Sequence, residues 1–369
     1  GNDRLPDAVL ESIVTRTEGI PLFIEEFSKS LLESVSLESL ESGRGVLDSM
    51  RLPETLQESL LSRLEHLPEA SKAVIRLASV IGRSFSYDLL KAIVDVEESD
   101  MRARLNPIID AELIVQNAGE FGVEFSFRHG LIRDVVYQTL LQSDREELHL
   151  ETAEAGETLH ADYPDRYPEF FAHHFTEAAR PDKAVTYWLR AAEKSVQSFS
   201  LLEARDQLET GLEQLQQLPD TVENRSVHIH YLIVLGPVLL RLEGSTARAT
   251  RDLYEQAIEL CDRLPEPEQQ FKALWGQWQA APDYRKEQGG AYTANLSHLA
   301  ERINDPEVKL QLHHHQWATL FYQGQFSRVL DHAEAGLGAF AGACLLYTSP
   351  SPRDFKYDLV CRLLLEKGG

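Results

Sequence analysis

From residue 145 to residue 339 the sequence is helical throughout, and this regularity restricts the fold more than any other feature. Apolar residues recur at helical spacing, and short turns separate the segments. The predicted pairs are residues 168–179 with 183–199, 201–218 with 225–242, 246–264 with 268–281 and 292–304 with 307–321, and residues 325–339 open one more. Because each pair buries its apolar face only against its neighbours, the sequence predicts a stacked array of helix pairs.

Small residues at predicted contact positions let these helices approach closely: Ala191, Ala192, Ala204 and Ala257. The Gly324-x-Phe326 turn, followed by Val329 and Ala333, resembles the tetratricopeptide pattern, although the spacing departs from its regular period of about 34 residues. We therefore predict a degenerate tetratricopeptide-like array over residues 144–343. Its concave face is expected to hold a peptide or protein partner.

Residues 46–143 are predicted to form a smaller domain. Four helices are expected at residues 53–67, 68–81, 87–94 and 99–112, with Pro107 breaking or bending the last one. Two β-rich runs, residues 113–116 and 123–127, then flank a glycine-containing turn, which is typical of a hairpin. Helices followed by a hairpin are the order of a winged helix.

The charges argue against DNA as a partner of this domain. Between residues 87 and 112 the sequence has three basic residues and seven acidic ones. The whole chain has 36 Lys and Arg against 59 Asp and Glu, a net charge of −23. Such a field repels a phosphate backbone, so we expect neither DNA binding nor attraction to an anionic membrane.

Residues 5–34 are predicted to form two helices separated by Glu18-Gly19-Ile20-Pro21, where glycine ends one helix and proline starts the next. This segment resembles the Gly-x-Pro segment in the helical lid of signal-transduction ATPases with numerous domains (the STAND class). Residues 52–90 resemble the winged helix that follows that lid, and the likeness extends over residues 5–337. Plain helix punctuation is the alternative explanation of Gly-Ile-Pro.

The segment FRHGLIRDVVY contains a third residue to which the resemblance assigns a role. In the STAND class the winged helix closes with a Met-His-Asp-type motif whose histidine reads the β-phosphate of ADP, and His129 falls at the corresponding place. Arg128 stands where methionine is usual and Gly130 replaces the aspartate, so no role is carried over to Gly130. The resemblance implies that Gly19, Pro21 and His129 bind one nucleotide. By residue type alone, His129 could instead be a helix-start histidine bonded to nearby backbone.

The resemblance implies a lid segment in residues 1–45, a winged helix in 46–143 and repeats in 144–343. The predicted fold class is therefore mainly α: a helical lid segment, a winged helix with one β-hairpin, and an α-solenoid of tetratricopeptide-like helix pairs. Residues 344–369 resemble a translated sequencing-adapter read-through and are expected to be non-native, with a genuine loop and terminal helix as the alternative.

No GxxxxGK[ST] phosphate loop occurs in the sequence, and no strand ends in an acidic pair for Mg²⁺. We expect no catalytic residues and no ATP hydrolysis in this chain, with ATP or ADP as ligands of an intact parent protein only. No metal site is predicted either, because His313, His314 and His315 point three ways around a helix. Trp275 and Trp278 are predicted to be core anchors.

Three distant cysteines, the lack of any apolar run of about 18 residues, and the lack of a signal peptide fit a cytoplasmic protein without a membrane span. The chain begins Gly-Asn-Asp, and we expect a fragment whose true start lies upstream.

Within the STAND class, the sequence resembles the bacterial branch in which the ATPase and a helical repeat tail follow an adenylate or guanylate cyclase domain. This implies the regulatory part of a multidomain signalling ATPase, in which a nucleotide-dependent lid and winged helix act with the repeats to control an effector, a nucleotide cyclase, outside this chain. Two alternatives stay open. The chain could be a tetratricopeptide-like interaction scaffold with an inert winged helix, or part of an ATP-dependent transcriptional regulator.

Overall fold

The computed structural model describes Ile24 and residues 56–119, 122–159, 161–244, 247–264, 266–280 and 289–340. The chain divides into two compact units, Gly1–Arg180 and Pro181–Gly369. Helices dominate both units, and the described strands form one small sheet in the first unit. The predicted mainly-α class is therefore confirmed. The predicted lid, apart from Ile24, and the tail at residues 344–369 lie outside the described residues.

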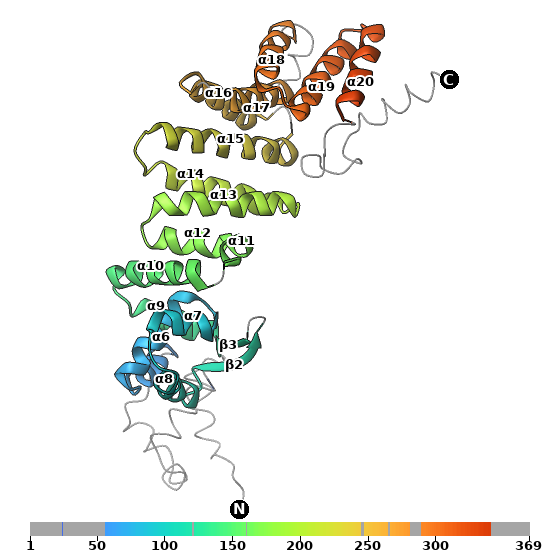
Figure 1. Ribbon diagram of the computed structural model, residues 1–369. Coiled ribbons are helices and arrows are strands. Elements are labelled where there is room, and N and C mark those ends of the chain that lie inside the picture. Colours follow the sequence, from blue (N-terminus) through green and yellow to red (C-terminus); the bar gives the residue numbers. More distant parts are fainter. Residues whose placement is uncertain are drawn as a thin grey trace, which may run out of the picture. The chain divides into compact units, whose positions relative to one another are not determined.

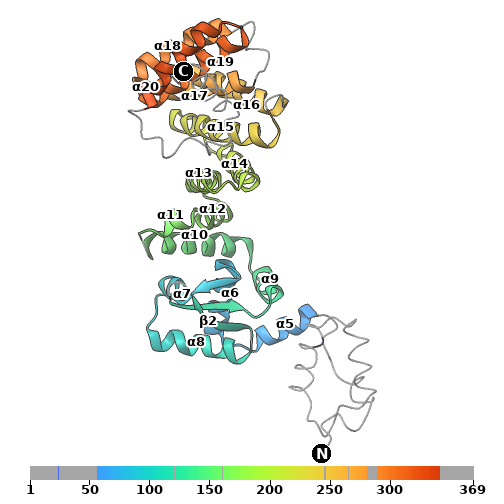
Figure 2. The same cartoon turned by 90° about the vertical axis from the view of Figure 1, so that its right-hand side faces the viewer.

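Short helices surround the small sheet in the first unit (Figures 1 and 2). Its elements in chain order are α5 (Leu56–Glu65), α6 (Glu69–Ile81), β1 (Ser84–Ser86), α7 (Tyr87–Val94), α8 (Glu98–Asp110), β2 (Ile114–Gly119), β3 (Gly122–Phe127), α9 (Gly130–Gln138), α10 (Gln142–Leu159), α11 (Tyr163–Arg166) and α12 (Pro168–Glu177).

The helix boundaries of this unit follow local sequence signals. α6 ends where Gly82 adopts a φ of 148°, a backbone conformation that residues other than glycine rarely adopt. α7 begins after Ser86, whose hydroxyl accepts a hydrogen bond from the backbone N–H of Leu89. α8 continues through Pro107, so the break that the sequence suggested there does not occur. Ile108, directly after the proline, is fully buried and holds the last turn of α8 against the core.

The sheet has three antiparallel strands in the order β1-β3-β2. The sequence predicted the β2–β3 hairpin, in which Ile114 pairs with Phe127. It did not predict β1, because three residues are too few to show a period-two pattern. The pairing of β1 with β3 places Phe85 opposite Phe125, and both rings are buried in the core.

The helices after the hairpin complete the core of the first unit. Leu148, Ala155 and Leu159 of α10 and Phe170 of α12 pack against the same apolar cluster as α6, α7 and α8. The predicted pair formed by residues 168–179 and 183–199 falls across the boundary between the units, and α12 packs on α10 within its own unit. The limit of the winged helix at residue 143 stays a prediction.

Each described helix of the second unit packs on the next one along the chain (Figure 1). In chain order they are α13 (Pro181–Gln197), α14 (Leu201–Leu215), α15 (Val222–Leu242), α16 (Arg248–Asp262), α17 (Pro267–Ala280), α18 (Gly289–Ile303), α19 (Pro306–Tyr322) and α20 (Phe326–Phe340). This succession agrees with the predicted stacking, because helices that are neighbours in sequence bury their apolar faces against each other.

Two buried tyrosines set the spacing of the helices in this unit. Tyr254 on α16 lies against Gly236 on α15 and Gly276 on α17, so closely that a Cβ at either glycine would overlap the tyrosine side chain. Tyr231 on α15 lies in the same way against Gly211 on α14. Because both rings are at most 2% exposed, neither can move aside into solvent. The glycines therefore permit a helix approach that no other residue would allow.

We expect Gly276→Ala to lower the free energy of unfolding by about 1–3 kcal/mol, because the added methyl group overlaps the fixed Tyr254 ring. Helix propensity acts in the opposite direction by up to about 1 kcal/mol, since alanine is the better helix former. Urea unfolding of the purified chain measures the net effect.

Gly336→Ala on α20 is the matched control. Its Cβ would meet His313 and Leu310 at 3.4 and 3.6 Å, which is ordinary contact, so only the propensity gain remains. Equal effects of the two substitutions would show that the Tyr254 contact does not fix the spacing.

Candidate functional site

His129 lies between strand β3 and helix α9 and is the N-cap residue of that helix. Its backbone is extended, with φ −137° and ψ 142°, and its carbonyl accepts a hydrogen bond from the N–H of Ile132 at 3.0 Å. The buried ring of Phe127, at the end of β3, anchors the junction. The side chain of His129 makes no capping hydrogen bond. The side chain therefore does not cap α9.

The Nε2 atom of His129 is shielded from solvent and has no hydrogen-bond partner among the described residues. Leaving such a nitrogen unsatisfied costs about 1–3 kcal/mol. Next to it, Gly130 has open space where a Cβ would lie, and the first turn of α9 contains no acidic side chain. The positive end of the helix dipole is therefore not neutralised within that turn. An anionic oxygen is the group that would satisfy both features.

Arg128, directly before His129, is held by two contacts. Its guanidinium pairs with the carboxylate of Glu112 at 2.9 Å, and its backbone N–H donates to the carbonyl of Leu113. Both contacts tie the start of α9 to the loop between α8 and β2. Arg128 therefore positions the backbone that carries His129.

A chain of buried hydrogen bonds anchors the other end of α9. The Tyr137 hydroxyl lies 3.0 Å from Nε2 of His149 on α10, and Nδ1 of His149 lies 2.8 Å from Nδ1 of His174 on α12. His174 also bonds to the backbone of Ile81, at the end of α6. The chain thus connects four helices through side chains that are buried or partly buried.

The three contacts set the tautomers of both histidines when the rings are neutral. Each contact needs one proton, so Tyr137 donates to His149, His149 donates to His174, and His174 donates to the carbonyl of Ile81. In this order both imidazole rings are neutral.

The surroundings of the pair also favour the neutral forms. Burial lowers the pKa of His149 to about 3, and neighbouring His173, Arg133 and Arg145 act in the same direction. Burial likewise holds the pKa of His174 well below its usual value. The two arginines lie over the ring of Tyr137, with their guanidinium carbons 4.7 and 4.6 Å from its centre. Burial also lowers the pKa of His173, and the nearby carboxylate of Glu177 offsets part of this effect.

We expect the free energy of unfolding to fall as the pH drops from 7 to 5. Above about pH 6.5, His149 is neutral in both the folded and the unfolded chain, so its shifted pKa has no effect on stability. Below that pH the unfolded chain binds a proton, whereas the folded chain, with a pKa of about 3, does not. This difference costs about 2 kcal/mol between pH 7 and 5 for His149, and buried His174 adds to it.

Urea unfolding at a series of pH values measures this loss, and carboxylates contribute little because most of them titrate below that range. His149→Gln should reduce the pH dependence by about one proton. His66→Gln, at an exposed ring just beyond the end of α5, serves as the control variant. An unaltered pH dependence in the His149 variant would contradict the assignment.

The structure describes only one of the three residues to which the resemblance assigned nucleotide binding. Gly19 and Pro21 lie outside the described residues, so whether they approach His129 stays a prediction.

The structure agrees with the predicted orientations of the histidine run on α19. His313 faces His332 at 3.4 Å between Nδ1 atoms, His314 stacks on Trp317, and buried His315 bonds to Thr293. Within the described part of the chain, no group of three or more His, Cys, Asp or Glu residues could hold a metal ion. Trp278 is 3% exposed, as expected of a core anchor.

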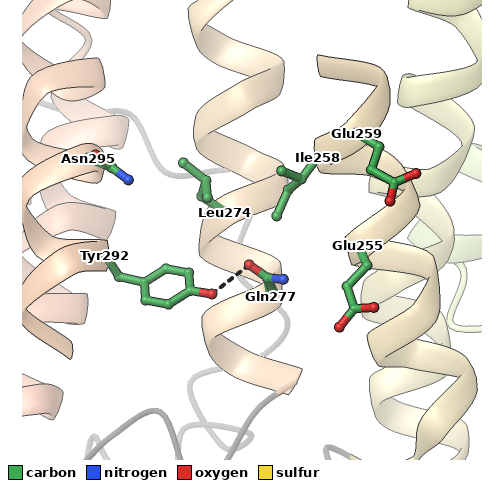
Figure 3. A pocket seen from close by; sticks show the side chains of 7 residues that line it. All are labelled: Glu255, Ile258, Glu259, Leu274, Gln277, Tyr292 and Asn295. Carbon is green, nitrogen blue, oxygen red and sulfur yellow. Dashed lines mark hydrogen bonds between the residues drawn. The ribbon is translucent and has the colours of Figure 1, made fainter. Parts of the chain in front are cut away.

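A pocket of about 430 Å³ lies between α16, α17 and α18 in the second unit. Figure 3 shows its lining on three helices: Glu255, Ile258 and Glu259 on α16, Leu274 and Gln277 on α17, and Tyr292 and Asn295 on α18. The Tyr292 hydroxyl donates to Oε1 of Gln277 at 2.7 Å and joins two of the three helices.

No sequence motif predicted this pocket. One signal was present, since Glu255 and Glu259 stand one turn apart on the face of α16 opposite its buried Tyr254, Ala257 and Cys261. The pocket exists because α16, α17 and α18 are spaced apart at that face, and no sequence pattern predicts this spacing.

No protein-family model matches the chain. The chain is similar to an uncharacterized protein of Rhizobium meliloti (strain 1021), with 28% identity over 349 residues. The similarity covers 90% of this chain and 33% of the relative, so the chain spans about a third of that protein's length.

Two solved structures are similar to the chain. One is a Signal Transduction ATPase with Numerous Domains (STAND) protein with a tetratricopeptide repeat sensor from Pyrococcus horikoshii, with 12% identity and a TM-score of 0.38, covering 100% of this chain and 54% of that one. The other is BtubC from P. vanneervenii, with 13% identity and a TM-score of 0.23, covering 72% of this chain and 94% of that one.

Among the described helices, none combines the length and apolar character that crossing a membrane requires.

Proposed function

We propose that this chain is the sensor part of a STAND-type signalling ATPase. In this proposal, a lid and a winged helix respond to bound nucleotide, and the helical array of the second unit binds a protein partner. The ATPase core and the effector, a nucleotide cyclase, belong to other parts of the parent protein. The STAND-like sequence of residues 5–34 and 52–90 supports the proposal.

The observation that carries the proposal is the unpartnered Nε2 of His129 at the start of α9. The order of elements from α5 to α9, with β1 beside the hairpin, also supports a winged helix. A helix start, a shielded imidazole nitrogen and open space at Gly130 together fit a phosphate oxygen of a nucleotide.

In the proposed mechanism, His129 donates a hydrogen bond from Nε2 to the β-phosphate of ADP. One hydrogen bond to a charged oxygen stabilises a complex by about 1.5–3 kcal/mol. The contact with Glu112 holds Arg128 in place, and the bond from Tyr137 to His149 holds the far end of α9. His129 thereby favours the closed form with ADP, and the open form prevails with ATP or with a partner on the repeats.

His129→Ala in a parent that carries the ATPase core should weaken ADP binding by about ten- to a hundredfold. ATP affinity should change less, because the winged helix does not contact nucleotide in the open form. Isothermal titration calorimetry with both nucleotides measures the two losses separately.

Two further variants sharpen this test. His129→Gln keeps a donor near the position of Nε2 and should retain more ADP affinity than His129→Asn. His66→Ala, an exposed histidine of the same unit, serves as the control and should change neither affinity. Equal losses for ADP and ATP in the His129 variants would show that the residue acts only on stability.

We expect the purified chain to show no ATP hydrolysis, because its sequence contains no phosphate loop to hold a triphosphate. A coupled assay for released phosphate measures the turnover. Hydrolysis that persists through a second purification and scales with the concentration of the chain would contradict this expectation.

A further inference from the structure

The pocket between α16, α17 and α18 lies in the second unit and contains none of the residues assigned to nucleotide binding. Its walls combine three kinds of surface. Ile258 and Leu274 supply apolar contact, Tyr292 supplies an aromatic ring, and the remaining lining residues are amides and carboxylates. A pocket with this mixture suits a ligand group that has an apolar stem and a polar tip.

The charged residues of the described lining are of one sign. Glu255 and Glu259 are exposed, and no described residue pairs with either carboxylate. They stand four residues apart on one helix, where like charges repel each other. Both charged side chains of the described lining are therefore acidic, and a cation held between the two carboxylates would relieve their repulsion.

The other side of the pocket is lined by polar side chains that contain both donors and acceptors. The Tyr292 hydroxyl donates its proton to Oε1 of Gln277. Asn295 lies on the same helix as Tyr292, and its side-chain amide lines the pocket (Figure 3). A guanidinium group, which has several donors and no acceptor, is complementary to the two carboxylates.

We propose that this pocket binds a basic side chain, an arginine or lysine, of an extended segment in the protein partner of the helical array. The methylene stem packs on Ile258 and Leu274, and the cationic tip lies between Glu255 and Glu259. The exposure of both glutamates and of Asn295 leaves the pocket accessible from the surface, as a side chain presented by another protein requires. The inference rests on the proposed partner-binding role of the array and names the chemistry of that partner.

Fluorescence anisotropy with the full chain and short labelled glycine–serine peptides tests this inference. One peptide carries a central arginine, a second carries citrulline, which has the same shape without the charge, and a third carries glutamate. The arginine peptide should bind saturably, and the citrulline peptide should bind about tenfold or more weakly, as expected for the loss of charge-assisted hydrogen bonds. The glutamate peptide should not bind.

The double variant Glu255→Gln, Glu259→Gln should reduce the affinity for the arginine peptide about tenfold and remove the preference over citrulline. Glu209→Gln with Glu213→Gln is the matched control, because these exposed glutamates of α14 have the same spacing and the same change of net charge. It should leave both affinities unchanged, which separates the pocket from the general charge of the chain.

Three results would overturn the inference: no saturable binding of the arginine peptide, equal binding of the arginine and citrulline peptides, or equal losses in the two double variants. If free arginine amide binds as tightly as the peptide, the proposal that the pocket recognises an extended segment is wrong. None of these measurements requires nucleotide. A failure here, with the effect of His129 on ADP intact, would therefore leave the nucleotide-sensing proposal standing.

Discussion

The contact of Tyr254 with two glycines fixes the arrangement on which much of the second unit depends. Its ring lies against Gly236 on α15 and Gly276 on α17, so α16 packs closely on both neighbours. The same helix turns Glu255 and Glu259 outward on its opposite face. One buried aromatic side chain thus sets the helix spacing and, through it, one wall of the candidate pocket. Interiors are close-packed, so such a contact tolerates little change in volume.

In the first unit, polar contacts hold both ends of α9. α9 is held at its start by the ion pair of Arg128 with Glu112 and near its end by the hydrogen bond from Tyr137 to His149. His129 lies between these two anchors along the chain, and its Nε2 has no partner among the described residues. Leaving that shielded nitrogen unsatisfied costs about 1–3 kcal/mol, so the packing around His129 does not account for its side chain.

Helix positions were predictable from the sequence because their causes are local. Apolar periodicity, Gly82 at the end of α6 and Ser86 before α7 each act within a few residues. The β2–β3 hairpin was predictable for the same reason, since two β-rich runs flank one turn. His129 was selected as a candidate residue because its position resembles that of a known motif. The resemblance could not predict the hydrogen bonding of the His129 side chain, because this depends on packing.

The sequence by itself thus determined which segments are helices, that they stack in succession, and that the chain carries a strongly negative charge. Only the tertiary structure decided the existence of β1. Three residues are too short for a recognisable strand pattern, and β1 forms because β3 offers a free edge. It alone decided that His149 and His174 meet as neutral rings and that two glutamates of α16 line a pocket. The physical reason is distance along the chain: periodicity and caps are set by near neighbours, whereas close approaches and buried protonation states depend on residues far apart in sequence.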